Sequence, residues 1–143
     1  MSNPEKRIVE FIKEHHVLTL ATCVENSPWC ANCFYIYLET ENCFVFTSND
    51  KTKHVQDVLA NANVAGSVVL ETNTVGKIQG IQFNGVMQMP EKSLATTAKK
   101  AYLKRFPFAV LMKTSLWTVK LNHIKMTDNR LGFGKKLIWQ KEL

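Results

Sequence analysis

The sequence predicts a mainly β protein with helices, of the α+β class: a small antiparallel β-barrel of about six strands with flanking helices. Two observations predict it. Short strand-like segments follow one another between polar turns, and helical segments interrupt them after the third strand and before the last long one. The last long strand also changes its alternation phase near Asn122-His123, which indicates a β-bulge. Bulges and glycines let a sheet curl, so a barrel is favoured over an open sandwich.

The first half of the chain predicts one helix and three strands. Asn3-Pro4 is typical of an N-cap followed by proline at the first helical position, and apolar residues at helical spacing continue this helix to about Glu14. Residues 17–24 and 29–38 are rich in β-branched and aromatic side chains and predict a hairpin. A third strand at residues 43–47 follows a tight polar turn, so the three strands predict an antiparallel meander.

The second half of the chain predicts two helices and three strands. A short helix opens at a basic turn after the third strand and stops near Asn61. The remaining elements are expected at residues 64–70, 81–89, 93–106 and 117–126. The segment 81–89 alternates strictly, and Gly80 and Gly85 indicate bends or bulges in it.

Length and composition predict one domain over residues 1–143. At 45% hydrophobic residues, the chain is long enough for one core and too short for two. Its apolar windows are shorter than a membrane span and its N-terminus lacks the apolar core of a signal peptide, so we expect a cytoplasmic protein that does not bind a membrane. The net charge is +6, but the basic residues are scattered, so the charge alone does not separate a nucleic acid, an acidic partner and an anionic small ligand. A nucleic-acid partner would need stacking platforms such as Trp29, Phe34, Tyr35 and Tyr37, and strand alternation would bury many of these aromatics, so we expect none.

The four cysteines are expected to be reduced, because a domain of this size does not need disulfides and nothing directs it to an oxidising compartment. Cys30 and Cys33 have CxxC spacing, yet they lie in a predicted strand. Positions i and i+3 of a strand point to opposite faces and cannot easily chelate one ion. The sequence therefore predicts no metal site.

The turn after the third strand has the features of an anion site. It reads Thr47-Ser48-Asn49-Asp50-Lys51-Thr52-Lys53-His54. A helix N-terminus carries about half a positive charge and unpaired N–H groups, so basic residues there lie at the unfavourable end. A phosphate would remove this penalty by accepting hydrogen bonds from the amides, the hydroxyls and the ammonium groups. The alternative interpretation is a solvated helix start with surface lysines.

The order of the elements and the spacing of Phe46-Thr47, Lys53 and Leu59 resemble the pyridoxamine 5′-phosphate oxidase-like family of FMN-binding split barrels. Further segments resemble its small bacterial YhbP-type branch: Trp29-Cys30-Ala31-Asn32, Lys51-Thr52-Lys53-His54, Gly80-Ile81-Gln82-Phe83, Lys100-Ala101-Tyr102, Arg105-Phe106-Pro107, Thr127-Asp128-Asn129 and Leu131-Gly132-Phe133-Gly134-Lys135-Lys136. The resemblance implies a six-stranded split barrel and a homodimer whose FMN lies in the cleft between the subunits.

The resemblance also implies which residues hold the FMN phosphate. Thr47 and Lys53 match the family's phosphate-binding positions, and Ser48 is their neighbour. Flavin-binding members typically have serine and then arginine before the matching lysine, whereas this chain has Lys51 and Thr52. A hydroxyl and a cation are both kept, but lysine lacks the fork with which arginine holds two phosphate oxygens, so FMN is expected to bind more weakly.

Two further residues match cofactor positions of the family. Gln82 resembles the polar position that faces the flavin ring, although strand alternation equally allows it to face solvent. Trp139 resembles an aromatic that the partner subunit brings near the isoalloxazine, although a tryptophan near a terminus can instead anchor an interface.

The function that the resemblance implies is a flavin-dependent oxidoreductase acting on an unknown small molecule, with FMN as the cofactor. No catalytic residue is predicted, because His54 has no nucleophile or carboxylate partner in the local sequence. An enzyme is still possible, since the flavin itself carries the redox chemistry. The alternative is a non-catalytic binder of another anionic or planar ligand, a flavin carrier or a haem binder, with His15, His16 and His123 as the candidate histidines.

Overall fold

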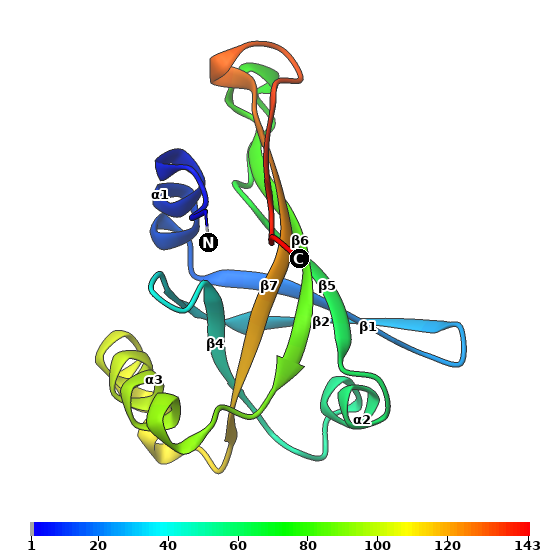
Figure 1. The fold of residues 1–143 in the computed structure, drawn as a ribbon, viewed down its shortest axis with the longest axis vertical. Helices are drawn as coiled ribbons and strands as arrows, with labels where there is room; N and C mark the ends of the chain where they lie inside the picture. Colours follow the sequence, from blue (N-terminus) through cyan, green and yellow to red (C-terminus); the bar gives the residue numbers. More distant parts are fainter. Residues whose placement is uncertain (1) are drawn as a thin grey trace.

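An antiparallel sheet of eight strands organises residues 2–143, the part of the chain that the computed structural model describes (Figure 1). The elements in chain order are α1 (Lys6–Glu14), β1 (Val17–Val24), β2 (Ser27–Phe34), β3 (Ile36–Leu38), β4 (Cys43–Ser48), α2 (Lys53–Ala60), β5 (Asn63–Val69), η1 (Val75–Lys77), β6 (Gln79–Gln88), α3 (Lys92–Arg105), η2 (Pro107–Leu111), β7 (Ser115–Asp128), η3 (Asn129–Leu131) and β8 (Lys136–Gln140). The predicted antiparallel barrel with flanking helices is confirmed, with eight strands in place of about six.

The strand order explains how the sheet wraps. It runs β2-β1-β5-β6-β7-β4-β3, with β8 added beside β7, so β2 and β3 lie at the two ends of the path although they are consecutive in the chain. Only Tyr35 separates them; its amide donates to the carbonyl of His16 and its hydroxyl to the carbonyl of Ile12. The chain therefore passes from one edge of the sheet to the other at Tyr35, which brings the edges together.

Two sequence predictions are corrected here. Residues 29–38 were expected to form one strand, but it is divided at Tyr35, because residues up to Phe34 pair with β1 whereas residues from Ile36 pair with β4. The two sequential pairings expected for the meander do form, β1 with β2 and β3 with β4, but the break at Tyr35 puts them at opposite ends of the strand path, so they do not make one continuous meander. Aromatic side chains occur on both sides of the break, so they gave no signal for it.

The predicted bulge is confirmed in the longest strand pair. In the β6–β7 ladder, Asn84 lies opposite His123 and Gly85 lies opposite Leu121, so Asn122 is the extra residue. A Cβ atom added to Gly85 would lie 2.2 Å from the carbonyl oxygen of Lys120. The two backbones therefore approach so closely at the bulge that only glycine fits there.

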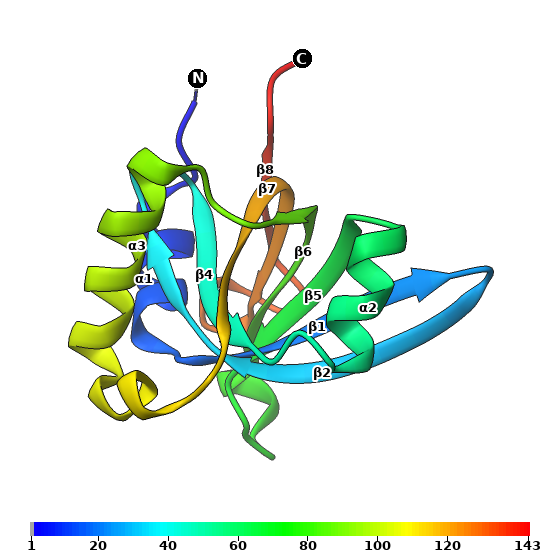
Figure 2. The ribbon, with the colours of Figure 1, turned by 90° about the horizontal axis from the view of Figure 1, so that it is seen from below.

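The helices α1 and α3 cover the β3–β4 part of the barrel and lie on the same side of the molecule (Figure 2). Helix α1 begins at Lys6 rather than at Pro4, with Glu5 as an N-cap that makes no side-chain hydrogen bond, which corrects the predicted start. Arg105, at the end of α3, donates to the backbone carbonyls of Lys13, His15 and Tyr35. This guanidinium joins the ends of both helices to the break between β2 and β3.

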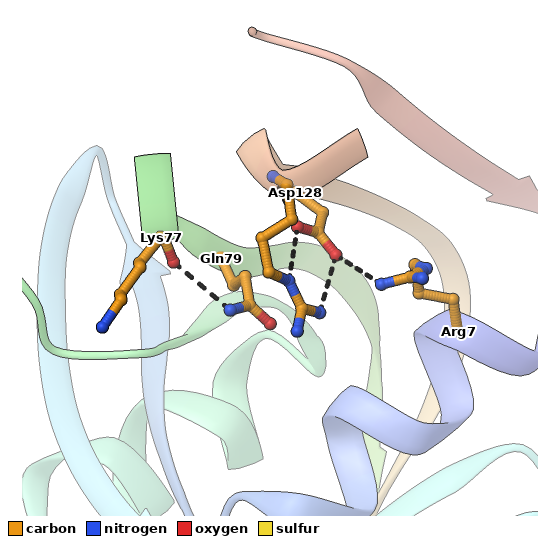
Figure 3. Close-up of polar contacts among 5 residues, drawn as sticks. Arg7, Lys77, Gln79 and Asp128 are labelled. Atoms are coloured by element: carbon orange, nitrogen blue, oxygen red, sulfur yellow. Dashed lines mark hydrogen bonds and ion pairs between the residues drawn. The ribbon is translucent and has the colours of Figure 1, made fainter. Parts of the chain in front are cut away.

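A buried carboxylate fixes α1 to the far end of β7. Asp128 has no exposed side-chain surface and accepts hydrogen bonds from Arg7 of α1 at 2.8 Å and from the guanidinium of Arg130 at 3.0 and 3.1 Å (Figure 3). The hydrogen bonds from Arg130 hold the pKa of Asp128 below its ordinary value, and the hydrogen bond from Arg7 makes a smaller contribution in the same direction. The carboxylate therefore stays charged between its two cations.

Helix α2 packs against β1 and β2, close to where these strands form a long hairpin (Figure 1). The other side of the sheet keeps its side chains partly or fully exposed; we call this side the outer face and define it by the cross-strand row Thr19, Ser67, Gln82 and Lys125. Within residues 2–143, no helix has the length and apolar character needed to cross a membrane.

Candidate functional site

The turn between β4 and α2 has a defined internal structure. Thr52 is the N-cap of α2; its hydroxyl accepts from the amide of Val55 at 3.4 Å and donates to the carbonyl of Asn49 at 2.8 Å. The side chain of Asn49 accepts from the amide of Lys51 at 2.8 Å. The amides of Lys53 and His54, the first two of the helix, point out of its end without an intrahelical acceptor.

Ser48 and His54 connect the strand to the helix. The hydroxyl of Ser48 and Nε2 of His54 are 2.8 Å apart, and Ser48 also contacts the thiol of Cys33. Burial lowers the pKa of His54, against the opposing charge of Asp57, which favours the neutral imidazole. Burial raises the pKa of Cys33 to about 11, so this cysteine is a protonated thiol at neutral pH rather than a nucleophile.

Lys53 is held by a carboxylate one helical turn further on. Its ammonium lies 3.0 and 3.2 Å from the two oxygens of Asp57, and the same carboxylate accepts from the hydroxyl of Thr22 in β1 at 2.8 Å. The indole ring of Trp29 in β2 lies 5.5 Å from the ammonium, within the range of a cation–π contact. The predicted phosphate-binding lysine therefore already has a partner in this structure.

Thr47 lies on the other side of β4 from Ser48, because neighbouring strand residues point to opposite faces. Its hydroxyl contacts that of Tyr102, which also donates to the carbonyl of Phe34 at 3.2 Å. Thr47 borders a cavity of about 190 Å³ between α3, η2 and the start of β7. The structure thus brings Ser48, Lys51, Thr52 and Lys53 together around the turn and places the Thr47 side chain in a neighbouring cavity.

Gln82 and Trp139 lie away from the turn within one chain. Gln82 is exposed on the outer face, where Ser67, Lys125 and Lys136 line the same hollow of about 420 Å³. Trp139, on β8, is 7% exposed, and its indole N–H donates to the carbonyl of Ser2 at 2.9 Å. A cofactor at the turn can meet either residue only if a second copy of the chain supplies it.

The sequence analysis missed two parts of this site. The sequence does contain a signal for the contact between Asp57 and Lys53, because a lysine and a carboxylate four residues apart on a helix are expected to pair. Thr22 has none, since a hydroxyl in a strand 35 residues before Asp57 shows no relation to it until the chain folds. The contact between Trp29 and Lys53 also has no local signal, because β2 and α2 come together only when the chain folds.

The two cysteines of the CxxC spacing lie in β2. Cys30 is exposed and Cys33 is buried, on opposite faces of β2, and all four cysteines are free. Throughout residues 2–143, no group of three or more His, Cys, Asp or Glu side chains could hold a metal ion.

Comparison with known proteins agrees with the topology. A family model described as pyridoxamine 5′-phosphate oxidase matches residues 4–125. A UPF0306 protein from Photorhabdus laumondii is 40% identical over 134 residues, 94% of each chain. The UPF0306 protein YhbP from Salmonella arizonae is 41% identical over 135 residues, 94% of this chain and 92% of that one.

Solved structures with little sequence similarity share the same fold. HutZ, described as the heme storage protein from Vibrio cholerae, superposes with a TM-score of 0.70 at 17% identity and covers 85% of this chain and 92% of its own. An FAD-binding protein from Mesorhizobium loti gives 0.67 at 11% identity, with 84% and 91% covered. The class is thus an antiparallel split barrel. Within that class, the chain belongs to the pyridoxamine 5′-phosphate oxidase-like family, in its YhbP-type UPF0306 branch.

Proposed function

We propose that this protein binds FMN and works as a flavin-dependent oxidoreductase on a small molecule, with the FMN phosphate at the β4–α2 turn. The observation that carries the proposal is the convergence of Ser48, Lys51, Thr52 and Lys53 around the exposed start of α2. Membership of the family supports it, and so does the FAD-binding protein that shares the fold.

The donors at the turn fit a phosphate ester. Lys51 is exposed, and no ion pair of its side chain occurs among the residues that the structure describes. The amides of Lys53 and His54 add two N–H donors at the positive end of the helix dipole. The ammonium of Lys53 and the hydroxyl of Thr52 each have an internal partner that an anion must share or replace.

The flavin would supply the redox chemistry through its isoalloxazine ring. The chain's own contribution is to bind the phosphate, to orient the ring and to exclude water from it. Neither Cys33, a buried thiol, nor His54, a neutral imidazole bonded to Ser48, is assigned a catalytic role. The free thiols agree with a reducing compartment, and we place the protein in the cytoplasm on that ground.

The proposal includes a homodimer, with the cofactor between the outer face of one copy and the turn of the other. Gln82 lies on that face, and Val69 and Ile138 expose 66% and 61% of their surface there. Apolar side chains on a broad sheet face that none of the helices described in residues 2–143 covers are typical of a protein interface. A second copy would also bring its Trp139 strand near this cleft.

Titration with FMN tests the phosphate site. We expect FMN to bind the wild-type protein and Lys53→Ala and Lys51→Ala each to weaken binding by roughly tenfold, because each removes a charge-assisted contact to the phosphate. Lys100→Ala, an exposed lysine on α3, is the matched control and should leave the affinity unchanged. Equal affinity in all four proteins would place the phosphate elsewhere.

A haem binder is the second candidate, because HutZ, described as a heme storage protein, shares the fold. His15 is engaged with the carbonyl of Phe11 at 2.8 Å, whereas the ring of His16 is exposed and stacks at 6.4 Å from Phe34. Titration with haemin, followed by its absorbance band, separates the two functions. Binding that is abolished in His16→Ala and unaffected by FMN would favour haem over flavin.

A further inference from the structure

We propose that Asp57 is an internal counter-ion that competes with the bound phosphate for the ammonium of Lys53, and so limits how tightly this turn holds its anionic ligand. The inference rests on the proposed function, because it assumes that a phosphate binds beside Lys53. It assigns to Asp57 a role in setting the affinity for the ligand, and Asp57 acts on the ligand only through Lys53.

The carboxylate of Asp57 is fixed from two sides. Lys53 approaches both of its oxygens, at 3.0 and 3.2 Å, and Thr22 donates to one of them at 2.8 Å. Asp57 is 7% exposed and Thr22 is 2% exposed, so neither side chain can turn into solvent without leaving a buried polar group unpaired. The hydrogen bond from Lys53, followed by that from Thr22, lowers the pKa of Asp57 and keeps it ionised at neutral pH.

The pairing directs the lysine away from the end of the helix. Lys53 is the first residue of α2 and Asp57 lies one turn further along. The ammonium therefore lies along the flank of the helix, against the ring of Trp29, rather than beyond the amides that open the helix. To bind a phosphate at the turn, Lys53 must share its ammonium with that phosphate or leave Asp57.

The charges around the turn balance in the free protein. Lys51 and Lys53 contribute two positive charges, and Asp50 and Asp57 contribute two negative ones. His54 adds none when its imidazole is neutral. A dianionic phosphate thus meets a site whose formal charge is zero, and Asp57 is the acidic residue that contacts a phosphate-binding lysine directly.

A different role for Asp57 predicts the opposite sign. If the carboxylate only positioned Lys53 for the ligand, its removal would weaken FMN binding. If it competes with the ligand, its removal strengthens binding, because the repulsion between two negative groups disappears and the ammonium is released. The sign of the change in affinity therefore separates competition from positioning.

The experiment compares FMN and riboflavin titrations of wild type and Asp57→Asn. Asparagine keeps the size of the side chain and an oxygen that accepts from Thr22, and thermal unfolding checks that the variant is folded. We expect Asp57→Asn to bind FMN roughly tenfold more tightly. Riboflavin, which has no phosphate, should bind both proteins equally.

Two controls separate release of Lys53 from a general change in charge. Asp50→Asn changes the net charge by the same amount in the same turn, but Asp50 bonds to Ser115 and not to Lys53, so its gain should be smaller. In a Lys53→Ala background, the extra gain from Asp57→Asn over Asp50→Asn should vanish, as a double-mutant cycle requires for a coupled pair.

Each result decides the matter. Unchanged or weaker FMN binding by folded Asp57→Asn, or an equal gain in Asp50→Asn, would overturn the inference while leaving the proposed function intact, provided that wild type binds FMN and Lys53→Ala binds it less well. If neither wild type nor Asp57→Asn binds FMN, the proposed function and the inference fail together.

Discussion

At the residue scale, the carboxylate of Asp128 is a buried charge whose stability depends on two arginine partners. It has no exposed surface and receives guanidinium groups from two segments, Arg7 at the start of the chain and Arg130 near its end (Figure 3). Its oxygens also accept from the amide of Arg130 at 3.0 Å. The two guanidinium side chains are 39% and 51% exposed, so the cost of breaking these pairs falls on the buried Asp128 position, where charge-assisted hydrogen bonds are lost.

Asp128→Asn should therefore destabilise the protein by about 3 kcal/mol at pH 7. The pKa of Asp128 is lowered on folding, so its contribution is complete above the ordinary carboxyl pKa, about 3.8, and is lost as the pH falls through the folded value. Urea unfolding at pH 7 and near pH 3 checks this. A stability difference between wild type and variant that stays constant at both pH values would contradict it.

The candidate site shows what residue-level reasoning can reach. The sequence predicts that Lys51 and Lys53 lie at the start of a helix, and α2 does begin at Lys53. This prediction is possible because the start of a helix depends on local sequence. The bonds from Lys53 to Asp57 and from Asp57 to Thr22 depend on how β1 packs against α2. The sequence therefore predicts which residues form the turn but not that one of them is already paired.

At the scale of elements, the sequence predicted some strand limits and the pairing of strands next to each other in the chain, but not the pairing of strands far apart in it. The bounds of β1 agree with the prediction, and the bulge at Asn122 appears where the alternation changes phase. The pairing of β4 with β7 joins segments about 70 residues apart, and no local pattern specifies it. Local periodicity determines which face of a strand is buried, and tertiary packing determines its neighbour.

Gly85→Ala tests the bulge. The new methyl group would lie 2.2 Å from the Lys120 carbonyl oxygen, a backbone atom that cannot move without opening the β6–β7 ladder. We expect a loss of about 2 kcal/mol or more in the free energy of unfolding. Gly76→Ala is the matched control, since an added Cβ there meets nothing within 4 Å. Equal stability of the two variants by chemical denaturation would show that the β6–β7 approach is not constrained.

At the scale of the whole molecule, the proposed site is divided between two surfaces of the chain. The turn at α2 and the outer face with Gln82 belong to different sides of the sheet, so one copy cannot enclose a flavin with both. A homodimer that places these surfaces against each other resolves the division. Dimerisation is thus a requirement of the proposed flavin site rather than an addition to it.

Ala65→Arg tests this arrangement. Ala65 is exposed on the outer face, where arginine fits the monomer but adds bulk and charge to the proposed interface. We expect the wild-type protein to be a dimer by light scattering, and the variant to be monomeric with at least tenfold weaker flavin binding. Thr96→Arg, an exposed position on α3, is the control. A monomeric wild type, or a dimeric Ala65→Arg variant, would contradict the proposed interface.

The proposed flavin site depends on recognition of the FMN phosphate by the turn before α2. The most direct test is to measure the affinities of the wild-type protein for FMN and for riboflavin under the same conditions. Because the two molecules differ only by the phosphate, we expect FMN to bind at least tenfold more tightly than riboflavin, by roughly 1.4 kcal/mol or more. Added salt should reduce this difference in affinity, because it screens the charge of the phosphate. Equal affinities at low salt would contradict it.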